Sequence, residues 1–360
     1  MNRPLRLTAI VLLLLAAESP ADPADARRIQ KSWDLAMEKW SLEARTATTP
    51  EARAKVIAER PNADSFARQM WQAIGPALDQ TWTVEPAAWF LVTTRSLVTT
   101  APDGSTKPAF AAETETLRKA IETHHLKSPG LIPLCMALAA YGDPHSLSIL
   151  EKIEAGHPDP KTRGVAAFGG SMILKSLGDD PELMRKRLAK LRKAIIESSD
   201  VEIQGTTLAK LAENELYQIR FLAKGRIAPD LGGVDSGGRP LRLSDMKDKI
   251  VLLLFWSGSL PEAERVIQIT SGMLGKFKGR PFVVLGVNHD PVEKLRSMEA
   301  DGTVAWRNFS DPENKLAVEY RIGSWPWVYV LDGERKIHYT GTPGSFAELT
   351  AEALLSETKP

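Results

Sequence analysis

The residues best placed to do chemistry lie in one turn, residues 257–263, which follows an unbroken apolar run over Ile250–Trp256. A run of this length and β-favouring content predicts a strand buried on both faces. A helix-like segment follows, so the turn would lie at a helix N-terminus, where unpaired N–H groups and the helix dipole can hold an anion or a thiolate. Simple capping is the alternative, because Ser259 and Glu262 have the spacing of a capping box, worth about 1 kcal/mol.

Thiol and metal chemistry have little support elsewhere in the sequence. Cys135 is the one cysteine of the 360 residues, so an internal disulfide is excluded. It lies in an apolar helical segment, which predicts a buried, inert thiol. The histidines at positions 124, 125, 145 and 157 lack acidic or cysteine partners at metal-ligand spacing, so we expect them in loops and on the surface. No metal and no cofactor is predicted.

Composition places the chain among ordinary globular proteins, with 43% hydrophobic and 25% charged residues. The length of 360 residues favours two domains. The net charge of +1 gives no strong attraction to nucleic acid or to an anionic membrane, so no nucleic-acid partner is expected.

Residues 1–21 have the layout of a secretory signal peptide: two arginines, a mostly apolar run over residues 7–17, then small residues including Ser19 and Ala21. The run is about half as long as a membrane-spanning helix requires. We therefore expect an exported protein, periplasmic or extracytoplasmic, with cleavage after Ala21 and no transmembrane span in the mature chain. An uncleaved anchor is the alternative.

Residues 22–224 have helical patterning, with apolar residues at three-to-four spacing such as Ile29, Trp33 and Met37. Further along, small-residue-rich apolar helices follow turn signals at residues 142–144 and 178–181. The weak repeat of helix pairs, about 30–40 residues each, predicts an all-α, helical-repeat-like domain. An irregular helical bundle is the alternative.

The second domain is predicted over residues 225–360, after a Gly- and Pro-rich junction beginning near Lys224. Beyond the central strand and helix, we expect a buried strand over residues 281–288 and a helix over residues 290–301. A helix over residues 311–320 would be capped by Asp311, with Pro312 at its first position. Asp332-Gly333 predicts a hairpin between two strands, and a last helix spans residues 345–355.

Three segments of this domain resemble the thioredoxin-like redoxin group, which includes AhpC/TSA-like proteins, and particularly its exported TlpA-type members. They are GGRPLRLSDMKDKIVLLLFW with the following Pro-containing turn, VVLGVNHDP, and LAVEYRIGSWPWVYVLDGERKIHYTG. The resemblance implies a thioredoxin-like α/β sandwich, with Pro326 in the place of the family's cis-proline. It also implies thiol–disulfide oxidoreductase or peroxide-reducing activity.

The sequence departs from this family at its active turn. Aligned without a gap, the family's Cys-Pro-x-Cys falls on the sequence Leu260, Pro261, Glu262 and Ala263. Thiol–disulfide exchange needs one sulfur to attack and another to resolve the mixed disulfide, and neither leucine nor alanine supplies one. The fold is therefore expected without the family's chemistry, and the degenerate turn comprises Ser259, Leu260, Pro261, Glu262 and Ala263.

Two uses of this region remain open. In the resembled family, the backbone beside the cis-proline pairs with an extended client peptide. The corresponding groove here would comprise Trp256, Trp325, Pro326 and Trp327, unless these tryptophans simply pack beneath the turn. A Ser259 nucleophile would need His289 as its base, since the fold brings the loop containing His289 to the same sheet edge.

The favoured function is non-catalytic binding of proteins or extended peptides by an exported protein, with the helical domain as a docking surface. The first alternative is a thiol–disulfide oxidoreductase or peroxiredoxin-like enzyme that borrows a partner's thiols or uses Cys135 between molecules. The second alternative is a structural component of an envelope assembly.

Overall fold

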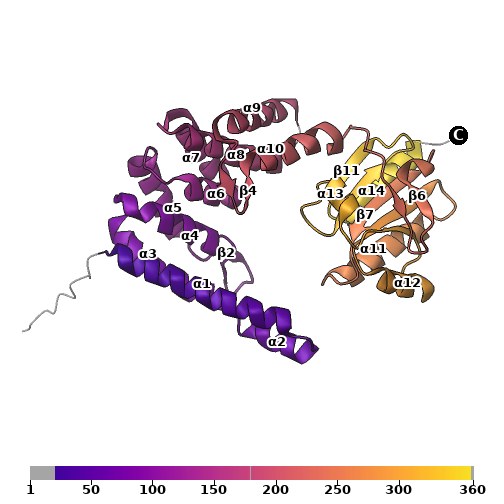
Figure 1. Ribbon diagram of the computed structural model, residues 1–360, viewed down its shortest axis with the longest axis horizontal. Coiled ribbons are helices and arrows are strands. Elements are labelled where there is room, and N and C mark those ends of the chain that lie inside the picture. The colour runs from indigo at the N-terminus through magenta and orange to yellow at the C-terminus, as the bar shows by residue number, and fades with distance from the viewer. Residues whose placement is uncertain (1–20, 179, 358–360) are drawn as a thin grey trace, which may run out of the picture. The chain divides into compact units, whose positions relative to one another are not determined.

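The computed structural model describes residues 21–178 and 180–357. The predicted signal peptide therefore lies, except for Ala21, outside the described residues. The chain divides into two compact units, one ending at Val201 and one beginning at Glu202. Residues 202–224 group with the second unit, and the boundary that we predict near Lys224 stays a prediction. Figure 1 traces both units along the chain.

Helices form most of the first unit. It contains α1 (Pro23–Thr46), α2 (Pro50–Ala58), α3 (Ala63–Ile74), α4 (Val84–Thr94), α5 (Ala111–Ala120), α6 (Ile132–Tyr141), α7 (Pro144–Gly156), α8 (Pro160–Leu177) and α9 (Pro181–Ser198). Short helical turns occur at Gly75–Ala77, Thr81–Thr83 and Ile121–His125, and a small hairpin pairs β1 (Val98–Thr100) with β2 (Thr106–Pro108).

Aspartate–proline pairs start the last three of these helices. Asp143, Asp159 and Asp180 are the N-caps of α7, α8 and α9, and each carboxylate accepts a hydrogen bond from a backbone N–H in the first turn. A proline follows each of them at the first helical position, where the missing N–H costs nothing. The turn signals at residues 142–144 and 178–181 therefore mark the starts of α7 and α9 correctly.

Glycines allow α8 to pack closely against its neighbours. A Cβ at Gly164 would lie 1.8 Å from the Ser198 Oγ at the end of α9. A Cβ at Gly169 would lie 3.3 Å from the Cys135 carbonyl oxygen of α6. The small residues of this helix thus set the spacing of the helix stack.

The second unit contains a central mixed sheet. Its elements are β3 (Glu202–Ile203), β4 (Thr206–Thr207), α10 (Leu208–Tyr217), a helical turn (Gln218–Leu222), β5 (Gly232–Val234), β6 (Pro240–Arg242), a short turn (Leu243–Asp245), β7 (Ile250–Trp256), α11 (Ala263–Lys276), β8 (Phe282–Asn288), α12 (Val292–Ala300), β9 (Arg307–Ser310), α13 (Lys315–Glu319), β10 (Trp327–Leu331), β11 (Ile337–Gly341) and α14 (Ser345–Glu357). The strand order is β11-β10-β7-β8-β9, with β7, β8 and β9 parallel and β10 antiparallel to both of its neighbours.

Strand β7 is buried along its whole length, as its composition predicts. Its alternating side chains enter two different cores, because successive residues of a strand point to opposite faces. Leu252, Leu254 and Trp256 pack with α11 and α14, which Figure 1 shows in the same unit. Leu253 and Phe255 pack instead with residues of β6, α13 and the helical turn Gln218–Leu222.

The predicted helix over residues 311–320 is wrong in its start and its cap. Helix α13 begins only at Lys315, after Asn314 in a left-handed conformation with φ 60°. The Asp311 N–H donates to the Asn288 carbonyl (2.9 Å), which holds this residue at the sheet edge. Its carboxylate accepts from the Ala317 N–H (3.1 Å) instead of capping a helix at residue 312.

Within the part of the chain that the structure describes, no helix combines the length and the apolar character needed to cross a bilayer.

Candidate functional site

Four segments of the second unit meet at one edge of the sheet, where β7, β8 and β9 end and β10 begins. The strand register places Trp256 beside Asn288, and Asn288 beside Ser310. Trp327, the first residue of β10, lies opposite Phe255. Ligands of open α/β sheets commonly bind beyond the carboxyl ends of the strands, so this edge is the candidate site.

A buried carboxylate, Asp290, holds the turn that follows β7. Its oxygens accept hydrogen bonds from Ser257 Oγ (2.9 Å), Gly258 N (2.5 Å) and Ser259 Oγ (2.6 Å). Asn288 Nδ2 donates from the other side (2.9 Å), and Lys294 Nζ lies 3.1 Å from Oδ1. The carboxylate of Asp290 thus serves as the acceptor for three successive residues of this turn.

These contacts keep Asp290 ionised. Burial alone would raise its pKa, but the hydrogen bonds from Ser259, Asn288, Gly258 and Ser257 outweigh burial and lower the pKa to about 2. A carboxylate so stabilised is a very weak base. Ser259 Oγ donates to it and accepts from Lys294 Nζ (2.8 Å), so nothing here activates the serine as a nucleophile.

The pairing of Ser259 with His289 is absent from the described residues. The His289 Nδ1 lies 3.2 Å from the Asp311 carbonyl oxygen, and its ring stacks on Trp325. The expected capping box is also wrong, because Glu262 is the N-cap residue of α11 and no side chain caps that helix. The Ser259 hydroxyl is held by Asp290, and so it does not cap α11.

The four positions of the family's Cys-Pro-x-Cys turn keep a compact backbone. The Ala263 N–H donates to the Leu260 carbonyl (3.1 Å), which closes a tight turn into α11. Leu260 is partly exposed and Ala263 is 9% exposed, while Pro261 and Glu262 face solvent. Residues 260–263 thus form a tight turn that contains no sulfur atom.

The segment before β10 contains a cis peptide bond between Trp325 and Pro326. The indole of Trp325 is half-buried, with its edge toward Phe255 (ring centroids 6.3 Å apart) and a tilted stack on His289 (5.6 Å, 34°). Trp327 is also half-buried, and its Nε1–H donates to Thr340 Oγ1 (2.9 Å). Among the described residues, no hydrogen bond involves the backbone of residues 323–325.

Trp256 does not line a groove, and that prediction is wrong. Its side chain is fully buried against Trp306, and its Nε1–H donates to Asn308 Oδ1 (3.0 Å). The space above Gly286 is filled by the same groups, because a Cβ there would lie 1.8 Å from Asn308 Oδ1 and 2.9 Å from Trp256 Nε1. Trp256 is therefore part of the floor beneath the site.

Sequence reasoning missed the residues that organise the turn, namely Asn288, Asp290 and Lys294. Their sequence signal is modest: polar residues stand directly after the buried strand β8, at the same sheet edge as the turn. The polar end of a parallel strand could have identified them as neighbours of the turn.

Cys135 is buried in α6, as its apolar surroundings predict. Burial raises the pKa of its thiol to about 12. Its thiolate is therefore almost absent at neutral pH, and the side chain has no access to a partner's sulfur.

Two of the histidines expected at the surface are instead buried. His125 contacts Ser128 Oγ (3.0 Å) and the Leu78 carbonyl (2.6 Å), while His157 contacts the Ser128 carbonyl (2.9 Å). They tie loops of the helical unit together. Over residues 21–178 and 180–357, no group of three or more His, Cys, Asp or Glu side chains is arranged to hold a metal ion.

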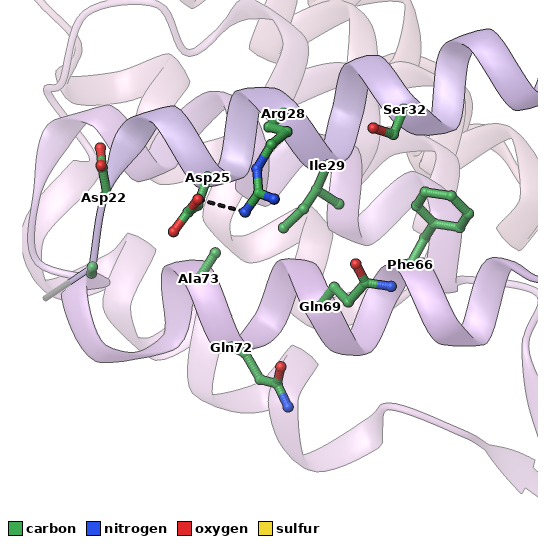
Figure 2. Close-up of a pocket in the computed structure, with 10 residues that line it drawn as sticks. Asp22, Asp25, Arg28, Ile29, Ser32, Phe66, Gln69, Gln72 and Ala73 are labelled. Atoms are coloured by element: carbon green, nitrogen blue, oxygen red, sulfur yellow. Dashed lines mark hydrogen bonds and ion pairs between the residues drawn. The ribbon is translucent and has the colours of Figure 1, made fainter. Parts of the chain in front are cut away.

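The first unit contains a shallow pocket of about 350 Å³ between α1 and α3, shown in Figure 2. Ile29 and Phe66 form its apolar part, and Asp25 pairs with Arg28 (2.6 Å) at its side. Both of these charged side chains are largely exposed and already paired. The pocket presents no buried polar group that would orient a ligand.

Residues 224–340 match the sequence model of the AhpC/TSA family. The curated proteins that are similar include Protein DipZ of Mycobacterium bovis and of Mycobacterium tuberculosis, each 28% identical over 148 residues. That match covers 37% of this chain and 21% of the DipZ chains. The chain thus spans about a fifth of the length of these curated relatives.

Similar solved structures include the thioredoxin domain of a thiol-disulfide oxidoreductase from Bacteroides vulgatus, with 26% identity, 37% of this chain and 98% of that chain covered, and a TM-score of 0.34. A putative thiol:disulfide interchange protein DsbE from Chlorobium tepidum is also similar, with 22% identity, 37% and 98% coverage, and a TM-score of 0.35. Over the matched residues, the second unit of the chain is a redoxin domain with the thioredoxin-like fold, and it contains no cysteine.

Proposed function

We propose that the protein is an exported, non-catalytic binding module whose redoxin domain takes up extended protein or peptide segments beside Trp325 and Pro326. The observation that carries this proposal is the unpaired backbone of residues 323–325, next to a turn that has no sulfur. A backbone without partners at a sheet edge can add a client strand through main-chain hydrogen bonds.

The side chains around this backbone support a binding role. Trp325 and Trp327 are half-buried, so each keeps a solvent-facing part that could contact an apolar client side chain. Gly323 and Ser324 are exposed and leave the backbone accessible. The turn opposite is rigidly held through Asp290, so a client would meet a preorganised surface and lose less conformational entropy of the site on binding.

Catalysis by thiol chemistry has no chemical support in this chain. The two turn positions lack sulfur, and Cys135 is buried with a raised pKa. We expect the purified protein to reduce neither insulin disulfides nor peroxide above the level of its Cys135→Ala variant. Turnover that disappears in that variant would overturn the non-catalytic proposal.

Export is the second part of the proposal and rests on the sequence of residues 1–21. The protein recovered from an envelope or periplasmic fraction of an expressing bacterium should begin at Asp22. An intact N-terminus in the cytosolic fraction would contradict export without bearing on the binding proposal.

The binding proposal is tested with immobilised arrays of short, cysteine-free peptides. Trp325→Ala should weaken wild-type binding about tenfold or more, because large aromatic side chains dominate interface energies. Leu349→Ala is a control, since this side chain is 59% exposed and lies on α14, which is not one of the segments that meet at the sheet edge. Equal binding by wild type and Trp325→Ala would move the binding surface elsewhere.

A further inference from the structure

In the His289 ring, Nδ1 contacts the Asp311 carbonyl, whereas Nε2 has no hydrogen-bond partner among the described residues. The Asp311 carbonyl can only accept a hydrogen bond, so the Nδ1 that faces it at 3.2 Å must carry the proton. In the neutral ring, Nε2 is then left as an acceptor. The side chain is exposed, and no contact to Nε2 occurs within the described residues.

The ring of His289 is positioned by its Nδ1 contact, by Trp325 and by its two neighbours in the chain. Its neighbours Asn288 and Asp290 are fully engaged, the first beneath the turn and the second with the turn itself. The ring stacks on Trp325 at 5.6 Å with an angle of 34°. His289 and Trp325 together form a tilted stack of two rings, which we call the aromatic pair, beside the unpaired backbone of residues 323–325.

Two exposed glutamates at this sheet edge favour a client side chain that carries a positive charge. Glu262 and Glu264 are exposed at the start of α11, and neither forms an ion pair with any described residue. Lys294 is already committed to Asp290 and Ser259, whereas Arg265 is the exposed cation nearby in the sequence. An acceptor nitrogen, an indole face and two unpaired carboxylates are all suited to a positive group that donates hydrogen bonds.

We propose that the aromatic pair selects client segments that place an arginine or lysine beside it. The cationic group lies beside the imidazole, over the part of the Trp325 indole that His289 leaves uncovered, and donates an N–H to His289 Nε2 in the plane of that ring, while the client backbone pairs with residues 323–325. Arginine fits best, because its planar guanidinium stacks on aromatic rings and keeps N–H donors free at its edge. This inference rests on the proposed peptide-binding function and adds the class of client.

The test uses a positional-scanning library of short, cysteine-free peptides with blocked termini, bound to the full chain. The wild type should prefer Arg and Lys over Asp and Glu at one position by about tenfold, in line with a cation–π contact plus a hydrogen bond. His289→Phe, which keeps an aromatic ring but loses the acceptor, should reduce that preference several-fold.

His289→Gln restores an acceptor without the ring and should recover part of the preference, whereas the exposed control His124→Gln should leave it unchanged. Peptides that lack charge should bind all four proteins alike.

The two proposals fail in different ways. Binding that depends on Trp325 but shows no basic preference, or prefers acidic residues, overturns the role of the aromatic pair and leaves the binding function standing. If the preference for basic residues persists in His289→Phe, then His289 does not contribute to that preference. No binding of any peptide by the wild type overturns both.

Discussion

Asp290 is the side chain that accepts hydrogen bonds from three successive residues of the turn, and five donors in all converge on its two oxygens. Bonds to a charged acceptor are stronger than neutral ones, and a buried donor left without its acceptor is costly. The carboxylate therefore contributes to stability as a charge and not only by its shape.

Asp290→Asn should lower the free energy of unfolding by about 2 kcal/mol at neutral pH. Because the folded-state pKa is depressed to about 2 from the ordinary value of 3.8, the wild-type advantage is fully present above about pH 4. It should disappear as the pH falls toward 2. Urea unfolding of both proteins over this range measures the effect, with Glu334→Gln as an exposed control. A difference that does not vary with pH would mean that the charge is irrelevant.

At the scale of elements, the strand β7, its turn and α11 keep the geometry for a disulfide that the sequence no longer encodes. The hydrogen bond from the Ala263 N–H to the Leu260 carbonyl brings these two positions within one tight turn. Their Cα atoms then lie within about 7 Å, which a disulfide can bridge.

The double variant Leu260→Cys with Ala263→Cys should therefore oxidise to an intramolecular disulfide in air. Thiol titration under denaturing conditions should find one reactive thiol, Cys135, before reduction and three after it. Each single variant should keep two free thiols. Persistence of three thiols in the oxidised double variant would mean that the turn differs from the described one.

The helices of the first unit are spaced by glycine. Gly164→Ala should destabilise this unit by about 1–3 kcal/mol, because the new Cβ meets the buried Ser198 Oγ at 1.8 Å. Gly156→Ala is the matched control, since its Cβ would have open space and the position is helical. Thermal unfolding followed by circular dichroism compares the two, and equal melting temperatures would argue against close packing at Gly164.

At the scale of the whole molecule, the second unit reaches back beyond the domain boundary that the sequence favours. Leu222 is 3% exposed and belongs to the core beneath β7, and Tyr217 and Phe221 pack against that core. A fragment that begins at residue 225 should thus be less stable than one that begins at residue 202, by about 2–4 kcal/mol. Urea unfolding of both fragments decides this, and equal stabilities would support a boundary near Lys224.

Local patterns in the sequence predicted the fold at this scale better than the site. The seven apolar residues of β7, the turn signals before α7 and α9, and the Asp332-Gly333 hairpin each express a short-range rule, and the structure contains all of them. The hydrogen bond from Ser259 to Asp290 joins residues that are 31 positions apart in the sequence, so no local pattern could reveal it. For the same reason the capping-box spacing of Ser259 and Glu262 was misleading.

Gly286 has a consequence for how the protein can vary. The side chains of Asn308 and Trp256 meet directly above the Cα of Gly286. Even one methyl group at this position would therefore displace these two buried side chains, which lie beneath the loops of the site. The exposed residues around the site, such as Glu262, His289 and Ser324, are not held by close packing of this kind. We therefore expect related chains to keep the buried residues Gly286, Asn308 and Trp256. Their exposed residues around the site are expected to differ, so that different relatives could bind different clients on the same buried framework.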